Sequence, residues 1–348
     1  MLGLIAFSNS GGLGIQTKRL YEMLKPDKVL LIDSRKFSKN KKMNWDWYPE
    51  EITKVTDGFP NNRDILDWIP GLKTVLTVEN PYNFFLIKAC RERGIKTIVQ
   101  SNYEFNENIY APHLPVPDLF LMPSYWKLKE MEEKFPGRVM YLPPPIDPEE
   151  FKDAREHPVK RRRFLHIVGV LAHEDRNGTM DLLRAVRRCK EDFELVIHSQ
   201  HKLPDHYIID DPRVTYRVKN FEKNVDLYIG FEALILPRRY GGLSLTTNEA
   251  LMSGMPVMMT DISPNNKLLP KEWLVPVRKK ASVQIRMSIN TYSAYSYSLA
   301  KKIDEWAKSP PNSAIARRIV FIISQLMSLR LSIVHCCNYY TPCVIFDT

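Results

Sequence analysis

The sequence predicts an α/β protein with two parallel-sheet domains. Near residues 2–24 and again at 231–261, an apolar run is followed by a glycine-containing loop and an amphipathic segment. This succession is the repeat unit of a parallel α/β sheet. The length of 348 residues agrees, because it exceeds one ordinary core and suits two domains of roughly 150 to 170 residues with a tail.

Short apolar runs predict buried strands, and the amphipathic segments between them predict helices. The expected strands are residues 2–7, 29–33, 74–78, 95–100, 119–122, 139–142, 164–170, 193–199, 214–218, 231–236, 256–259 and 273–277. The expected helices are residues 15–24, 84–93, 179–189, 247–253 and 298–308. Residues 45–60 show no clear periodicity and predict an irregular connection.

We place the domains at residues 1–143 and 144–290, followed by a C-terminal segment at 291–348 that returns to the first domain. Prolines at 143–145 stiffen the connector between the domains by fixing φ. In the last segment, 319–334 is apolar but interrupted by polar residues, so it predicts a docked helix rather than a transmembrane span. The tail beyond it has no assigned structure.

Composition is that of a soluble globular protein, with 44% apolar and 26% charged residues. No opening segment has the pattern of a signal peptide, so we expect a cytoplasmic protein. The five cysteines form no ligand spacing with the histidines, which makes a zinc site or a disulfide framework unlikely to explain them. We therefore predict no metal, and a monomer or weak dimer.

A net charge of +10 is compatible with a polyanionic partner such as nucleic acid, although much of such an excess is ordinarily solvated surface. The basic segments 39–42 and 160–163 could either contact such a partner or be solvated surface. Lysines at 39–42 could contact an acidic acceptor, and the second segment could grip phosphate, but solvated charge explains each equally simply.

Two loops predict an anion site. Gly241 and Gly242 are adjacent and precede a helix, so backbone amides can approach a phosphate or diphosphate. A similar loop near residues 11–14 follows the first strand. Thr17 stands where a third dinucleotide-binding glycine would be, and Lys18 does not follow the glycine a P-loop requires, so those two classes are disfavoured. A simple turn remains the alternative.

Three titratable side chains are further candidates for contact with a ligand. Glu249 lies early in the helix after the second loop, where it could accept hydrogen bonds from vicinal sugar hydroxyls or serve only as a helix residue favoured by the dipole. Glu104 follows a strand end, the edge where ligands collect, although a capping role is as good an explanation. His113 lies nearby and could serve the same cleft, but a loop histidine is more often structural.

The paired glycines, the run Asn248-Glu249-Ala250-Leu251 and the turn at 253–257 resemble the donor-site signature of the family 4 retaining glycosyltransferases, including viral, phage-like members. The resemblance implies GT-B architecture, two Rossmann-like domains facing a central cleft. It also implies a nucleoside-diphosphate sugar, UDP- or GDP-linked, as co-substrate, with no tightly bound cofactor. One departure is that Gly241 occupies the position of the family's earlier glutamate.

On this resemblance, Glu249 holds the donor ribose, the glycine-loop amides bind the diphosphate, and Arg176 replaces the family's basic residue. The catalytic candidates are Glu104, Arg176 and His113. The donor-binding candidates are Gly11, Gly12, Gly14, Arg176, Asn177, Arg239, Tyr240, Gly241, Gly242, Leu243, Ser244 and Glu249.

The function implied is transfer of a sugar to a hydroxyl acceptor with retention of configuration. The acceptor is left open between a modified DNA base, a protein, a lipid and a small molecule; for a viral protein the location would be the host cytoplasm. Two alternatives remain: a non-catalytic nucleic-acid-binding protein using the basic surface, and a sugar-nucleotide epimerase or phosphorylase on the same fold. A phosphorylase would need a pyridoxal-binding lysine, and none is recognisable in the sequence.

Overall fold

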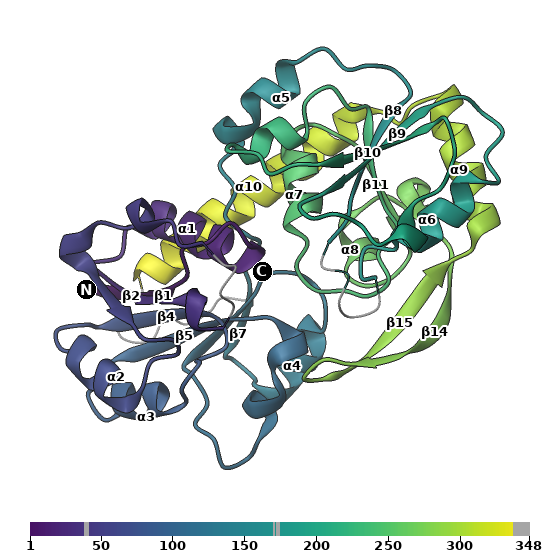
Figure 1. Ribbon diagram of the computed structural model, residues 1–348. Coiled ribbons are helices and arrows are strands. Elements are labelled where there is room, and N and C mark those ends of the chain that lie inside the picture. Colours follow the sequence, from purple (N-terminus) through teal and green to yellow (C-terminus); the bar gives the residue numbers. More distant parts are fainter. Residues whose placement is uncertain (38–41, 170, 172–174, 337–348) are drawn as a thin grey trace. The chain divides into compact units, whose positions relative to one another are not determined.

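The computed structural model describes residues 1–37, 42–169, 171 and 175–336, and within these the side chains of all but 110 and 326–336 (Figure 1). Of the predicted lysine segment at 39–42, only Lys42 lies within the described residues, and the tail beyond 336 lies outside them. Contacts divide the chain into two compact units. The first is Met1–Pro145 with the segment from Gln325, and the second is Ile146–Ser324.

The sheet of the first unit has the strand order β3-β2-β1-β4-β5-β6-β7, with every pair parallel. Its order reverses at β1, which pairs with β2 on one side and β4 on the other. The carboxyl edge at such a reversal is where open α/β sheets bind ligands. The strands are β1 (Leu2–Ala6), β2 (Lys28–Ile32), β3 (Thr53–Thr56), β4 (Thr74–Glu79), β5 (Lys96–Ser101), β6 (Leu119–Met122) and β7 (Val139–Tyr141).

Helices cover both faces of this sheet, and the alternation along β1 shows how. Leu4 packs in the same cluster as Leu20 of α1, whereas Ile5 packs on the opposite face with Ile65 of α2 and Leu86 of α3. Because both faces are buried, a central strand such as β1 is apolar along its whole length. The helices are α1 (Gly12–Leu24), α2 (Asn62–Trp68), α3 (Phe85–Arg91) and α4 (Leu128–Lys134).

The second unit repeats the same plan. Its sheet has the order β10-β9-β8-β11-β12-β13, again all parallel, and the order reverses between β8 and β11. The strands are β8 (Arg163–Ile167), β9 (Glu194–Ser199), β10 (Val214–Val218), β11 (Ala233–Leu236), β12 (Val257–Thr260) and β13 (Leu274–Val275). Both sheets thus have Rossmann-type order.

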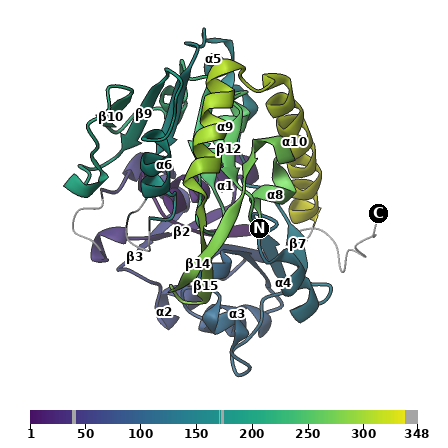
Figure 2. The ribbon, with the colours of Figure 1, turned by 90° about the vertical axis from the view of Figure 1, so that its right-hand side faces the viewer.

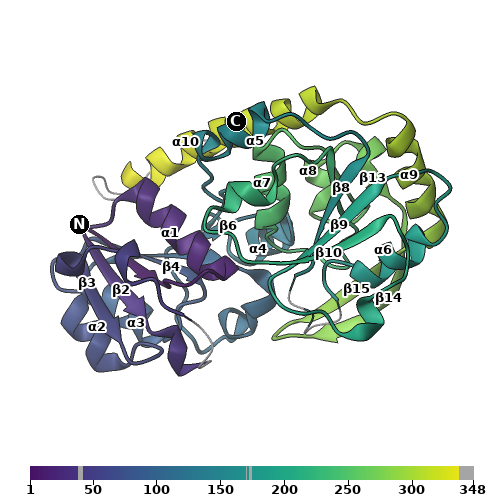
Figure 3. The same ribbon diagram turned by 45° about the horizontal axis from the view of Figure 1, so that its top comes forward.

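Helices of the second unit form one core with this sheet: α6 packs against α9, and α7 against β11 and β12 (Figures 2 and 3). The helices are α5 (Lys152–Glu156), α6 (Thr179–Val186), α7 (Leu245–Met252), α8 (Asn265–Leu268), α9 (Ser296–Lys308) and α10 (Ser313–Cys336). The division between the two units falls within α10. Among the residues described, no helix combines the length and apolarity needed to cross a bilayer.

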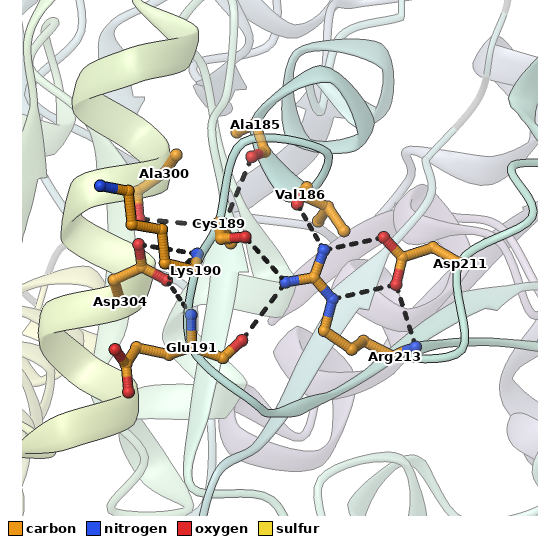
Figure 4. A network of polar contacts seen from close by, with 9 residues as sticks. All are labelled: Ala185, Val186, Cys189, Lys190, Glu191, Asp211, Arg213, Ala300 and Asp304. Carbon is orange, nitrogen blue, oxygen red and sulfur yellow. Dashed lines mark hydrogen bonds and ion pairs between the residues drawn. The ribbon is translucent and has the colours of Figure 1, made fainter.

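A polar network holds the carboxyl end of α6 (Figure 4). The Arg213 guanidinium donates to the carbonyl oxygens of Val186 at 2.8 Å and Cys189 at 3.1 Å, and it is paired with Asp211 at 2.8 Å. Just after α6, the backbone amide of Lys190 donates to the Asp304 carboxylate of α9, at 3.0 Å from one oxygen and 3.1 Å from the other. Cations near the carboxyl end of a helix satisfy its last carbonyls, so this network fixes the position of α6.

The predicted fold class is confirmed, but several elements were not predicted, among them the short helices α2, α4, α5 and α8, strand β3 and a hairpin after β13. Strand β3 lies within residues 45–60, for which the sequence predicts an irregular connection. The strand lies at the edge of the sheet, is only partly buried and carries no apolar run, so its sequence gives no strand signal. Residues beyond β13 form an antiparallel hairpin, β14 (Val277–Gln284) with β15 (Ser288–Ala294). Most of β14 is exposed, so its sequence lacks the apolar pattern by which strands are recognised.

Gly14 of α1 is expected to tolerate no side chain. A Cβ there would lie 1.9 Å from the backbone oxygen of Asn9, so main chain would have to move. We expect Gly14→Ala to lower the free energy of unfolding by about 1–3 kcal/mol, although alanine ordinarily stabilises a helix. Urea unfolding measures this loss.

The matched control is Gly11→Ala, where the nearest atom to a Cβ is the Asn9 side-chain oxygen at 2.9 Å. A side chain can rotate away, so a smaller loss is expected. Equal losses at the two positions would contradict the close approach at Gly14.

Candidate functional site

The loops that follow β8 and β11 lie at the point where the strand order of the second sheet reverses. They contain most of the predicted donor-binding residues, Arg176 and Asn177 in the first loop and residues 239–244 in the second. Ligands bind in open α/β sheets at this position, because the loops on either side of the reversal diverge. Both loops belong to the second unit.

A close approach of main chains joins the two loops. Gly178 has a φ of +72°, and a Cβ there would lie 2.1 Å from the Pro237 carbonyl oxygen. Beside it, the Arg239 amide donates to the Arg176 carbonyl at 2.9 Å. Only glycine permits this backbone contact, so Gly178 fixes the distance between the amino end of α6 and the loop after β11.

Asp175 caps α6. Its carboxylate accepts from the amides of Thr179 at 2.9 Å and Met180 at 2.8 Å, and the residue is 5% exposed. Burial raises the pKa of this carboxyl above its ordinary value, although the hydrogen bonds and the charge of Arg239 oppose the shift. Since an internal carboxylate occupies these amides, they are not available to an external anion at the amino end of α6.

Three arginines gather at this point. Arg176 donates to the Gly241 carbonyl at 2.6 Å, and its guanidinium lies 4.8 Å from the centre of the Tyr240 ring. Arg238 donates to the Leu243 carbonyl at 3.0 Å, and Arg239 donates through Nε to the Tyr292 carbonyl at 3.3 Å. Arg238 and Arg239 are buried, so their positive charge acts in a region of low dielectric.

The glycine loop then enters α7. Gly242 has a φ of +97°, which residues with side chains rarely adopt. Ser244 is the N-cap, and its hydroxyl accepts from the Thr247 amide at 3.3 Å. The Asn248 side chain donates to the Ser244 carbonyl at 2.7 Å. The loop therefore brings Gly241, Gly242 and the amino end of α7 to the same edge as Arg176.

Glu249 is buried in the first half of α7, 3% exposed. Its carboxylate accepts from the Tyr228 hydroxyl at 2.6 Å and from the Asn224 amide at 3.3 Å. These contacts orient the carboxylate. The alternative of a solvated helix residue is excluded by this burial.

Hydrogen bonds from Asn177 and His166 connect the loop after β8 to the strands of the second sheet. The Asn177 side chain donates to the Ile167 carbonyl at 3.0 Å. His166 is fully buried, with Nδ1 2.8 Å from the Ile235 carbonyl and Nε2 2.9 Å from the Thr179 hydroxyl. A carbonyl only accepts, so Nδ1 carries the proton and Nε2 accepts from Thr179. The neutral ring thus links β8, β11 and α6.

In the first unit, Gly11 ends the loop between β1 and α1, and Gly12 and Gly14 lie in the first turn of α1. The shape of the loop is fixed by Asn9, whose side-chain oxygen accepts from the Gly11 amide at 3.0 Å, and by Thr17, whose hydroxyl donates to the Phe7 carbonyl at 2.9 Å. The amino end of α1 has no side-chain cap and no acidic residue in its first turn. Unlike α6, it therefore has main-chain amides available to an anion.

Glu104 and His113 differ in environment. Glu104 lies just beyond β5 and is 3% exposed, whereas His113 is exposed in the connection that leads to β6. Both lie in the first unit, and Arg176 lies in the second. The Tyr103 ring beside Glu104 packs against Trp126 with ring centres 5.3 Å apart. This packing makes the surroundings of Glu104 more ordered than a loop position suggests.

Sequence reasoning missed His166, Asp175 and Tyr228. A signal existed for the first, because His166 is the single polar residue inside the buried stretch 164–168. Asp175 lies four residues before the first residue of α6, but whether its carboxylate accepts from the Thr179 and Met180 amides depends on the conformation of the loop between them. Within the described part of the chain, no group of three or more His, Cys, Asp or Glu is placed to hold a metal.

The fold and the site can now be compared with known proteins. The sequence matches no protein-family model, and no curated protein sequence matches it significantly. A glycosyltransferase from Rickettsia africae ESF-5 superposes with a TM-score of 0.68 at 13% identity, covering 98% of this chain and 99% of that one. Sucrose-phosphate synthase from Thermosynechococcus elongatus gives 0.64 at 13% identity, covering 96% and 98%.

A third similar structure is the pneumococcal O-GlcNAc transferase GtfA in complex with UDP and GlcNAc. Its TM-score is 0.57 at 13% identity, with 80% of this chain and 60% of that chain covered. At this identity the likeness establishes the fold. The chain has the GT-B fold, two Rossmann-like α/β domains of parallel strands.

His166 predicts a pH dependence of stability. Burial lowers the pKa of its imidazole from 6.5 to about 4, so between these values the unfolded chain binds a proton that the folded chain does not. Stability is therefore present above pH 6.5 and lost as the pH falls towards 4, by about 3 kcal/mol. Urea unfolding across this range measures the slope.

We expect His166→Gln to reduce this slope. In that variant His198, whose pKa is also lowered to about 4 by burial and by Arg217, still contributes a dependence of the same sign in the same range. The exposed His157 provides the control, since His157→Gln should leave the slope unchanged. An unchanged slope in His166→Gln would show that the ring is charged when folded.

Proposed function

We propose that this chain is a glycosyltransferase that uses a nucleoside-diphosphate sugar. The observation that carries the proposal is the gathering of Arg176, Arg239 and the Gly241–Gly242 loop where the strand order of the second sheet reverses. A diphosphate needs positive charge and closely approachable backbone amides, and this edge supplies both. The GT-B fold along nearly the whole chain supports the same conclusion.

In the proposed reaction, the bond between the anomeric carbon and the diphosphate oxygen breaks, and an acceptor oxygen bonds to that carbon. The acceptor hydroxyl loses its proton, which neutralises one charge on the departing diphosphate or passes to solvent. Negative charge grows on the leaving oxygens as the bond breaks. Arg176, Arg239 and the loop amides oppose that charge, which lowers the barrier because they are already oriented.

We assign Glu249 to the ribose of the donor, as an acceptor of hydrogen bonds from its vicinal hydroxyls. Tyr228 and Asn224 orient the carboxylate for this role. Retention of configuration is part of the proposal and is supported by the resemblance of 248–257 to the family 4 signature. UDP is the first nucleotide to test, since it is bound in the pneumococcal O-GlcNAc transferase structure.

We expect UDP to raise the melting temperature of the full chain, since a ligand of the folded form stabilises it. Arg176→Gln keeps a donor for the Gly241 carbonyl but removes the charge. Its affinity for UDP should fall about ten- to hundredfold, while its affinity for uridine, which has no phosphate, stays the same. Isothermal titration of both ligands measures the difference.

Arg184→Gln removes a charge from an exposed position on α6 and should change neither affinity. Incubation with UDP-sugars then tests turnover, and release of UDP that depends on Arg176 is the expected result. Equal loss of UDP and uridine affinity in Arg176→Gln would reduce its role to support of the loop. Salt-sensitive duplex binding without turnover would favour a nucleic-acid-binding protein.

Glu249→Gln tests the ribose assignment. Wild-type protein should bind uridine about tenfold more tightly than 2′,3′-dideoxyuridine, because the latter cannot donate to the carboxylate. The glutamine variant should bind the two nucleosides with similar affinity. Tyr228→Phe is the companion variant, since it frees the carboxylate from its orienting hydroxyl and should weaken uridine binding partially. A variant that still prefers uridine tenfold removes Glu249 from the site.

A further inference from the structure

The first half of α10 packs on the second unit through one face. Ala316 and Ile323 are buried in the core of that unit. Ile319 and Val320 are partly buried and pack against the same core. Positions spaced by three and four residues lie on one side of a helix, so these four side chains form a continuous inner stripe. The inner stripe accounts for the attachment of residues 313–324 to the second unit.

The opposite face of the same segment combines two arginines with two large apolar side chains. Arg317 and Arg318 are exposed. One helical turn later, Phe321 is 61% exposed and Ile322 48%. A helix with one packed face ordinarily carries polar residues on the other, so packing within the second unit does not explain these two apolar residues. We call the four residues the outer face of α10.

The chain provides only positive charge along this helix. The sequence of α10, Ser313–Cys336, contains three arginines and no Asp or Glu. The stretch without an acidic residue is longer still and runs from Trp306 to Phe346. The outer face therefore combines apolar area with local positive charge, and these two properties together are typical of helices that lie on anionic membranes.

We propose that the outer face of α10 binds the surface of an anionic lipid bilayer. Phe321 and Ile322 enter the boundary between headgroups and acyl chains, where their apolar area leaves water. Arg317 and Arg318 lie one turn away, so their guanidinium groups reach lipid phosphates while their aliphatic stems stay beside the apolar residues. The helix lies along the bilayer and does not cross it. This inference goes beyond the proposed transfer reaction, because it concerns where the chain acts, whichever acceptor it uses.

Two other partners fit the outer face less well. Phosphate contacts with nucleic acid would use the arginines but not Phe321 and Ile322. A stable protein partner, including a second copy of this chain, buries about 800 Å² on each side, which is much more than two apolar side chains supply. A lipid surface uses both the charge and the apolar area.

The test is sedimentation of the full chain with vesicles of phosphatidylcholine, either pure or mixed with phosphatidylglycerol. Wild-type protein should bind the mixed vesicles more tightly, and added salt should weaken this binding. Replacing both apolar residues, Phe321→Ser with Ile322→Ser, should weaken it about tenfold, because less apolar area leaves water. The melting temperature and the affinity for UDP should not change, since neither side chain belongs to the core of the second unit.

Arg317→Gln with Arg318→Gln should remove the preference for the mixed vesicles. The matched control is Arg187→Gln with Arg188→Gln, which removes the same charge from another exposed pair of arginines, just after α6. Tyr297→Ser is the control for the apolar change, because Tyr297 is 74% exposed on α9. Both controls should bind the two kinds of vesicle as the wild type does.

The proposal is overturned if the wild type does not bind mixed vesicles, or if the Phe321→Ser, Ile322→Ser variant binds them at the wild-type level. It is also overturned if the two arginine pairs contribute equally, which would show attraction by net charge alone. A wild-type dimer that dissociates in the serine variant would assign the outer face to a second copy instead. UDP binding is measured separately, so its absence would count against the glycosyltransferase function and leave the lipid result standing.

Discussion

The second unit depends on one contact between main chains, the approach of the amino end of α6 to the loop after β11. Gly178 allows the backbone of one loop to touch the carbonyl of Pro237 in the other, and neutral His166 ties the strands beneath to Thr179. Because the three elements are held by backbone and by a buried ring, the arginine-bearing loops have a rigid base, to which the Arg176 and Arg238 side chains add hydrogen bonds to loop carbonyls. Rigid support of this kind is what lets a site oppose charge without rearranging.

The same edge shows how positive charge is accommodated inside a core. Arg176, Arg238 and Arg239 each donate to a backbone carbonyl, and Arg176 also packs over Tyr240. Each carbonyl dipole stabilises the guanidinium that it faces, and the Asp175 carboxylate and Arg239 also attract each other.

Much of the fold follows from the sequence because both sheets are buried on both faces. Strands such as β1 and β11 are continuous apolar runs, and a run of this kind is visible without any tertiary information. Edge strand β3 and the exposed hairpin lack that signal. The Gly241–Gly242 pair was recognisable from its place before a helix, and Arg176 from the family resemblance; both lie at the same edge of the second sheet. The contacts that orient them, from Asp175 and Tyr228, join residues whose proximity exists only after folding.

Both hydrogen bonds between Arg239 and Tyr292 use backbone atoms of the tyrosine: its amide donates to the Arg239 carbonyl, and its carbonyl accepts from Arg239 Nε. Strand β15 thereby grips the arginine through main chain alone. A substitution at position 292 other than proline therefore keeps both hydrogen-bonding groups, whereas replacement of Arg239 removes the bond made by its guanidinium.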